Sequence, residues 1–174
     1  AASPERIFDA WTDPKQMVRW FKPSDEMSSD VEADLRVGGK YRIRMTAKNG
    51  IEHVSYGEYQ VIEPPERLVF TWSWESGMAV GTLVTISLRR VEGGTELTLR
   101  HERFQTEDQV REHAFFMAEH FPQRAWIAVE LLCGPDDSTR LSRVQQLGKT
   151  TGLPLVAAGD VHMHSSSRRI LQDT

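Results

Sequence analysis

The sequence predicts an α+β domain followed by a shorter α/β segment, and two observations carry this prediction. From about Asp30 to Arg103, apolar and polar residues alternate with a period of two, which is typical of half-buried antiparallel strands. After Ala125, apolar residues instead form continuous runs on either side of a helical pattern, which is typical of parallel strands. We therefore expect two different architectures in one chain of 174 residues.

The composition is that of a globular protein and argues against several functional classes. With 39% hydrophobic residues, 26% charged residues and a net charge of −4, a broad basic face for nucleic acid is not expected. No apolar run approaches the roughly 18 residues of a membrane span, and no signal peptide is recognisable. The single cysteine, Cys133, cannot form an internal disulfide, so we expect a reducing compartment, the cytoplasm, and an inert thiol. Both ends of the chain look cut.

The first 21 residues predict a pair of short helices. Ser3 is suited to cap the first helix, since Pro4 fits a first turn and Glu5 favours the positive end of the helix dipole. Asp13 and Pro14 restart a second helix, which carries the apolar residues Met17, Val18, Trp20 and Phe21.

The central region predicts an antiparallel meander of strands with one aromatic face. Tyr41, Ile43 and Met45 alternate with charged residues, and the same period-two pattern recurs up to His101. Turn signals separate the strands: Gly38-Gly39, Asn49-Gly50, Pro64-Pro65, Gly77 and Gly93-Gly94. The apolar face of such a sheet needs a cover. We expect one helix over residues 106–120 to cross the sheet and supply it.

The remaining chain predicts one βαβ unit. Residues 125–132 and 153–158 are apolar runs that we expect to be strands buried on both faces, with a helix starting near Pro135 between them. The two strands should be parallel and the crossover right-handed. One unit of about 50 residues cannot cover both faces of a parallel sheet, so we expect this part to be incomplete and loosely docked.

The first part of the chain resembles a known superfamily. The residues that carry the resemblance are SPERIFDAWTDP (3–14), RVGGKY (36–41), GEY (57–59), PPERLVFTW (64–72) and GGT (93–95). They resemble the START-like (SRPBCC) helix-grip domains, and within these the AHSA-like group, named for the activator of heat-shock-protein ATPase. The resemblance implies a curved antiparallel sheet with a long covering helix. The chain departs from it by lacking the family's strand before the first helix and its usual helix continuation after Phe115.

The second part resembles a different family. The segments RAWIAVEL (124–131), GPDD (134–137), GLPLVAAGDVHMH (152–164) and LQDT (171–174) resemble the PHP domain at the start of error-prone, DnaE-type DNA polymerases. This resemblance implies a partial α/β fragment of a PHP barrel. The family's N-terminal His-x-His motif and polymerase core are missing. We therefore divide the chain into domains 1–116 and 117–174, and hypothesise a spurious or fragmentary reading frame, since a natural fusion of these two families would be odd.

The candidate ligand pocket is the set of inward-facing residues on the sheet and helices. In a helix-grip domain such residues line a cavity for an apolar small molecule, although they are also able simply to fill a core. His101 ends the inward face of a strand and is a polar candidate, but no catalytic partner is identifiable for it. The candidate pocket residues are Trp11, Tyr41, Met45, Tyr59, Phe70, Trp72, Trp74, Leu97, Leu99, His101 and Phe115.

The candidate metal ligands lie near the C-terminal end. Asp160 and His162 match metal-binding positions of the PHP family, and His164 is a further candidate. A carboxylate and imidazoles at the carboxyl end of a parallel strand suit a divalent metal. A stable site needs three or four protein ligands, so we expect at most a vestigial site with adventitious metal and no cofactor.

These patterns favour a binding domain. We expect it to hold a small hydrophobic molecule or to contact a chaperone-like partner, fused to an inactive polymerase fragment. The alternative is a piece of an error-prone DNA polymerase, which performs translesion synthesis, with a foreign N-terminal attachment. No Ser/His/Asp or Cys/His arrangement is discernible, so we name no catalytic residue. Whether this chain is an enzyme stays open, but 174 residues leave no room for the carboxylates and template channel of a polymerase, so polymerase activity of this chain alone is not expected.

Overall fold

The computed structural model describes residues 2–22, 26–77, 79–120, 126–129 and 135–157. Contacts divide the chain into two compact units, Ala1–Gln109 and Val110–Thr174, which we call the first and second unit. Each is described by itself. Among the described residues, no helix combines the length and the hydropathy needed to span a membrane.

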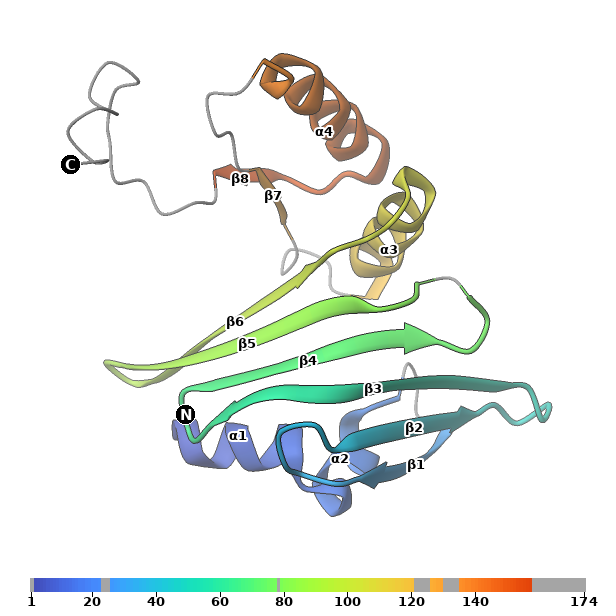
Figure 1. The fold of residues 1–174 in the computed structure, drawn as a ribbon, viewed down its shortest axis with the longest axis vertical. Coiled ribbons are helices and arrows are strands. Elements are labelled where there is room, and N and C mark those ends of the chain that lie inside the picture. Colours follow the sequence, from blue (N-terminus) through green and yellow to red (C-terminus); the bar gives the residue numbers. More distant parts are fainter. Residues whose placement is uncertain (1, 23–25, 78, 121–125, 130–134, 158–174) are drawn as a thin grey trace. The chain divides into compact units, whose positions relative to one another are not determined.

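The first unit is built on a six-stranded antiparallel sheet whose strands lie in chain order (Figure 1). This confirms the α+β class and the meander expected from the period-two pattern. The strands are β1 (Ser28–Ala33), β2 (Lys40–Thr46), β3 (Glu52–Glu63), β4 (Arg67–Trp74), β5 (Thr82–Val91) and β6 (Gly94–Glu102).

Two short helices precede the sheet, as expected. Helix α1 (Pro4–Thr12) begins where the Ser3 side chain accepts a hydrogen bond from the Arg6 backbone N–H, and α2 (Pro14–Trp20) begins where Asp13 caps Lys15 in the same way. Each cap satisfies an amide that has no partner inside its helix. The Trp20 indole N–H donates to the Ala10 carbonyl oxygen at 2.8 Å and fastens the two helices to each other.

One face of the sheet, which we call the inner face, carries the core. Tyr41, Ile43 and Met45 of β2 are 1–4% exposed, while the arginines between them point to the opposite, outer face. Phe8 of α1 and Met17 of α2 join the same cluster, so the two helices cover part of the inner face (Figure 1). Burial of this apolar surface is the main stabilising contribution in the first unit.

A β-bulge in β3 changes one detail of the expected alternation. The register with β4 shifts between Tyr59 and Val61, so Ile62 rather than Val61 packs against the core. The extra residue of a bulge moves every later side chain to the other face, which a strict period of two does not anticipate. Beside it, the loop before β2 is fastened to Tyr59, whose backbone bonds those of Gly38 and Gly39 at 2.8 and 2.9 Å.

Helix α3 (Glu107–His120) begins in the last residues of the first unit and continues in the second, which also contains β7 (Ile127–Val129), α4 (Asp137–Thr151) and β8 (Leu155–Ala157). Strands β7 and β8 pair in parallel around α4, so the expected βαβ unit is present. Helix α3 has the expected extent, and its Ala114 and Met117 pack in one cluster with Ala118, Ile127, Leu147 and Leu153. The described packing of this helix is therefore part of the second unit's own small core.

The prediction that both strands of the second unit are buried on both faces is wrong for the described residues. Trp126, Leu155 and Val156 are 57%, 37% and 46% exposed. A two-stranded parallel sheet with one crossover helix leaves a face uncovered, because both faces of a parallel sheet need a layer of packing elements. Helix α4 ends before Gly152, which adopts the left-handed conformation with φ of 74° that glycine favours at a helix end.

The inner-face core predicts that the same substitution at two isoleucines has very different effects on the stability of the protein. Ile43 is 1% exposed in the core of the first unit, whereas Ile51 is 54% exposed in the turn before β3. We expect Ile43→Ala to lower the free energy of unfolding by about 2–5 kcal/mol, because it leaves a cavity. The matched change Ile51→Ala should cost less than about 0.5 kcal/mol. Denaturant unfolding of both variants checks this, and equal losses would contradict the described core.

Candidate functional site

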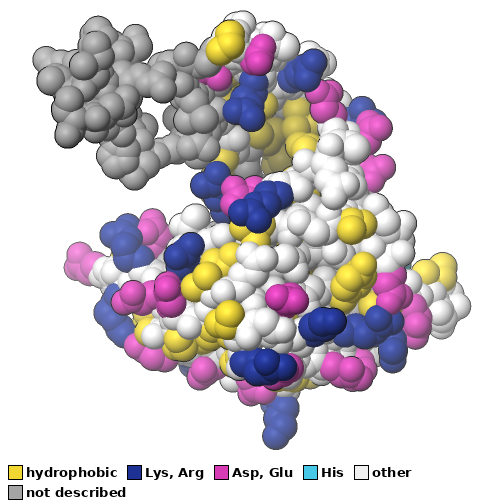
Figure 2. All heavy atoms as spheres, viewed as in Figure 1, with side chains coloured by type: hydrophobic (Ala, Val, Ile, Leu, Met, Phe, Trp, Pro, Cys, Tyr) yellow, Lys and Arg dark blue, Asp and Glu magenta, His cyan; other side chains and the backbone are white. Residues whose placement is uncertain are grey.

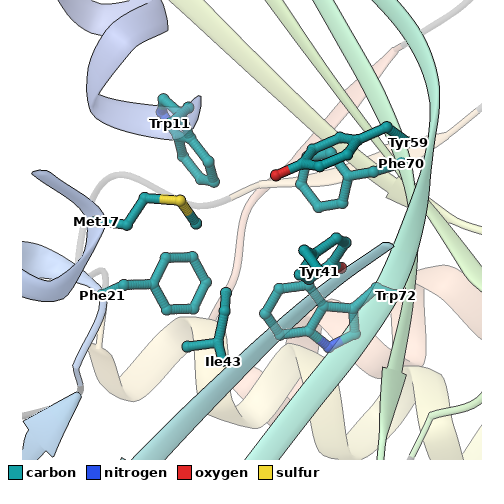
Figure 3. Close-up of a pocket in the computed structure, with 8 residues that line it drawn as sticks. All are labelled: Trp11, Met17, Phe21, Tyr41, Ile43, Tyr59, Phe70 and Trp72. Carbon is teal, nitrogen blue, oxygen red and sulfur yellow. The ribbon is translucent and has the colours of Figure 1, made fainter. Parts of the chain in front are cut away.

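An aromatic cup lies between the two N-terminal helices and the inner face of the sheet (Figure 3). The helices supply Trp11 and Met17, and Phe21 follows directly after α2. Strands β2, β3 and β4 supply the opposite wall. The eight lining residues are Trp11, Met17, Phe21, Tyr41, Ile43, Tyr59, Phe70 and Trp72. All are apolar or aromatic, and the tyrosine hydroxyl groups are their only side-chain oxygens.

The rings of the cup form a connected network that fixes its shape. The Phe21 ring stacks on Trp72 with centroids 5.7 Å apart, which joins the helix wall to the sheet wall. Within the sheet, the Tyr41 ring meets Phe70 edge-on at 5.5 Å and lies 5.5 Å from the Tyr59 ring. Such offset and edge-to-face pairs add a modest stabilisation beyond the burial of their area.

A glycine lets Tyr41 reach across the sheet. Gly57 lies directly opposite Tyr41 in the β2–β3 register. A Cβ atom at Gly57 would overlap the Thr71 carbonyl oxygen and stand 2.8 Å from the Tyr41 ring. Without that Cβ, the Tyr41 hydroxyl donates to the Thr71 carbonyl oxygen at 2.7 Å. Burial together with the nearby Tyr59 raises the pKa of Tyr41 well above its ordinary value of 10.0.

The Tyr59 hydroxyl is the polar feature of the cup. It points across the cup toward Trp11 in Figure 3, and no hydrogen bond to it is present among the described residues. Tyr59 is 2% exposed, and burial raises the pKa of its hydroxyl from 10.0 to about 12. The hydroxyl therefore stays protonated at neutral pH, with one hydrogen to donate and oxygen lone pairs to accept.

The free space in the cup is small. Its volume is about 10 Å³, which is the room needed for roughly one water molecule. A ligand with even one ring needs the helix wall, Trp11, Met17 and Phe21, to move outward. The arrangement thus resembles a closed aromatic clamp more than an open cavity.

The structure brings five of the proposed pocket residues together in this cup: Trp11, Tyr41, Tyr59, Phe70 and Trp72. Met45 and Trp74 lie outside it. Met45 is 2% exposed within the same core, and Trp74 packs against that core beside Trp72, with ring centroids 5.4 Å apart.

The other four proposed pocket residues are not brought to the cup. Leu97 and Leu99 of β6 are 39% and 41% exposed, and Phe115 of α3 is 44% exposed and belongs to the second unit. His101 is held by Thr82: the Thr82 hydroxyl donates to the Trp72 carbonyl oxygen at 2.9 Å and meets His101 Nε2 at 2.7 Å. Since that hydroxyl has a single hydrogen, Nε2–H of His101 is the donor in the second bond.

Sequence reasoning missed three lining residues. Ile43 lies between Tyr41 and Met45 on the same strand face, so the alternation already placed it. Met17 and Phe21 stand four residues apart, one helical turn, in the stripe recognised for the second short helix. The sequence does not single them out, because it favours residues 106–120 as the cover of the sheet.

The proposed metal ligands Asp160 and His162, with His164, lie outside the described residues, as does Cys133. Within the described part of the chain, no group of three or more His, Cys, Asp or Glu side chains is placed to hold a metal.

The face drawn in Figure 2 carries basic and acidic side chains interspersed rather than gathered by sign. Opposite charges also pair on the outer face of the first unit, among them Arg42 with Glu75 at 2.5 Å and Arg89 with Glu96 at 2.5 Å. Such a face lacks the clustered positive charge of a nucleic-acid footprint.

Two groups of known proteins are similar to this chain, and the first group consists of error-prone DNA polymerases. The chain is 57% identical over 58 residues to an error-prone DNA polymerase of Dechloromonas aromatica, which covers 33% of this chain and 6% of that polymerase. It is 32% identical over 175 residues to an error-prone DNA polymerase of Methylococcus capsulatus, which covers 92% of this chain and 17% of that protein. The chain thus spans less than a fifth of the length of these two relatives.

Solved structures and a family model agree on the fold. A crystal structure from Chromobacterium violaceum matches with 31% identity and a TM-score of 0.55, over 59% of this chain and 73% of that protein. One from Rhodobacter sphaeroides matches in fold with 23% identity and a TM-score of 0.60, over 84% and 83%. The model of the family described as "Activator of Hsp90 ATPase homolog 1-like protein" matches residues 1–125. The chain therefore belongs to the Activator of Hsp90 ATPase homolog 1-like family.

Proposed function

We propose that the first unit is a binding domain that holds a small aromatic or otherwise apolar molecule in the aromatic cup. The observation that carries this proposal is the lining: eight side chains, from both helices and three strands, converge on one space without a charged group. Pockets for small organic ligands are mostly apolar with a few placed polar groups, and the Tyr59 hydroxyl supplies one here.

Entry requires the helix wall to open, and the wall is suited to this. Helices α1 and α2 have nine and seven residues and are fastened to each other by the Trp20–Ala10 hydrogen bond. Helices this short have little stability of their own and depend on their packing. A ligand that replaces the contacts of Phe21 with Trp72 offsets part of the cost of opening the wall.

The proposal also covers cofactors, localisation and protein partners. It involves no cofactor, a divalent metal being at most adventitious, and it places the chain in the cytoplasm, which the single cysteine favours. A chaperone-like protein partner, which the family's description suggests, is the second kind of partner that such a domain would contact.

The aromatic cup predicts saturable uptake of one apolar fluorescent dye per chain. We expect Phe21→Ala to bind the dye at least about threefold more tightly, because the ligand no longer has to displace a ring. Dye titration by fluorescence measures this, and competition with indole or naphthalene reports whether small aromatic molecules share the site. The matched control is Phe115→Ala, which removes the same ring from an exposed position of the second unit.

Two results would contradict ligand binding at the cup. One is dye uptake by the folded wild-type chain that never saturates. The other is an equal change in affinity for Phe21→Ala and Phe115→Ala, since that would place the dye outside the cup.

The buried tyrosines predict loss of stability at high pH. The pKa of Tyr59 rises from 10.0 unfolded to about 12 folded. The unfolded chain therefore loses this proton first, and the free energy of unfolding falls as pH rises from 10 toward 12, by about 2–3 kcal/mol from Tyr59. We expect Tyr59→Phe to show a smaller fall over this range, with the remainder due to Tyr41. Denaturant unfolding at several pH values tests this, and identical pH profiles would refute it.

A second proposal concerns the origin of the second unit. The chain is 57% identical over 58 residues to an error-prone DNA polymerase, and the segments that resemble a PHP domain lie at 124–131 and 152–164. Together these favour derivation of residues 117–174 from the PHP domain of such an enzyme. In this proposal the fragment is inactive, and any translesion synthesis belongs to a longer parent protein. No polymerase activity is proposed for these 174 residues themselves.

Sequencing the source locus on both sides of the coding region tests the second proposal. We expect polymerase coding sequence near the part that encodes the second unit, with a break in the reading frame or a separate gene around residue 116. An intact continuous gene that encodes only these two parts would contradict the fragment hypothesis.

A further inference from the structure

Strand β6 forms an open edge of the sheet in the first unit. It stands last in the strand order, and among the described residues it pairs only with β5 (Figure 1). Its nine residues, Gly94–Glu102, match β5 in continuous register without a bulge, and none of them is proline. An edge of this length, without a bulge or a proline to interrupt pairing, is a template for a further strand.

Within the first unit, the inner face of β6 is also uncovered. Leu97 and Leu99 lie opposite Leu88 and Ile86 of β5, which are buried at 6% and 1% exposure. The two β6 leucines are 39% and 41% exposed, although they share the same sheet face. The apolar surface of the inner face therefore continues to the edge and ends there in contact with water.

The sequence of β6 is complementary to itself when it is reversed about Thr98. In antiparallel pairing of two β6 strands with Thr98 opposite Thr98, Glu96 of each copy lies opposite Arg100 of the other. Leu97 likewise lies opposite Leu99. The two charge pairs then fall on the outer face, and the two leucine pairs fall on the inner face. Both kinds of cross-strand pair stabilise a sheet.

We propose that two copies of this chain associate by antiparallel pairing of their β6 strands, with Thr98 at the two-fold axis. The result is one continuous sheet across both copies, in which the exposed leucines cover one another. The interface is isologous, because the same strand contributes from both copies.

The opposite edge of the sheet is not suited to the same pairing. Strand β1 carries Asp30 and Glu32 on its outer face, opposite Arg44 and Arg42 of β2. Reversed about Val31, Asp30 of one copy would meet Glu32 of the other, which places like charges opposite each other and disfavours pairing. The charge pattern thus selects β6 and not β1 as the edge that pairs with a second copy.

The charges of β6 already take part in contacts within the chain. Glu96 is bound by Arg89, and Arg100 Nε stands 2.9 Å from Glu102. All four side chains are at least 32% exposed, so the proposed pairs extend these contacts into a network across the interface without requiring burial of a charge.

Charge reversal tests this register. Sedimentation or light scattering of the full chain over a range of concentrations measures its mass, and we expect it to rise from 19.9 kDa toward twice that value. Either single change, Glu96→Arg or Arg100→Glu, places like charges opposite each other at both 96–100 pairs of the dimer. Each should therefore weaken association about tenfold or more. The double variant, and an equimolar mixture of the two single variants, restore opposite charges at both pairs and should regain association.

The rescue separates loss of pairing from loss of folding, because the double variant carries both substitutions. A wild-type chain that keeps the mass of one copy at every concentration would overturn the proposal. So would a double variant or mixture as weak as the single variants. Association that survives each single reversal unchanged would mean that another surface joins the copies, and would overturn it as well.

Discussion

The first unit depends on keeping one face of a six-stranded sheet away from water. Alternation along β2 to β5 gathers aromatic and aliphatic side chains on that inner face, and their burial outweighs every exposed ion pair of the outer face. Helices α1 and α2 pack against this face, and in the aromatic cup they lie opposite β2, β3 and β4. The aromatic cup is the place where this cover meets the sheet.

The helices of the first unit cover only part of the inner face. Both the proposed ligand site in the aromatic cup and the proposed pairing of β6 follow from this. At the covered end, large rings fill the space between helix and strand almost completely, leaving room for about one water. At the other end, Leu97 and Leu99 continue the apolar face without a helix of the first unit above them. An incompletely covered apolar face favours a further partner: a small molecule that enters the cup, and a second copy that covers the edge.

The second unit shows the same constraint in a smaller form. Its parallel strands β7 and β8 have α4 as their crossover, and Ile127 of β7 shares a small cluster with α3, yet Trp126 and Val156 remain exposed. A βαβ unit needs packing layers on both faces of its sheet, and this part of the chain supplies too little.

The sequence by itself determined the strand order, the inner and outer faces, both N-terminal helices and the parallel unit, because these follow from local periodicity and capping residues such as Ser3 and Asp13. Four cup residues, Tyr41, Tyr59, Phe70 and Trp72, followed from the strand alternation, and Trp11 followed from the helical pattern. Only the tertiary structure decided which helices cover the cup, since Met17 and Phe21 look no different locally from Val110 and Ala114. It also decided the bulge that turns Ile62 inward and the exposure of Leu97, because both depend on contacts between residues distant in sequence.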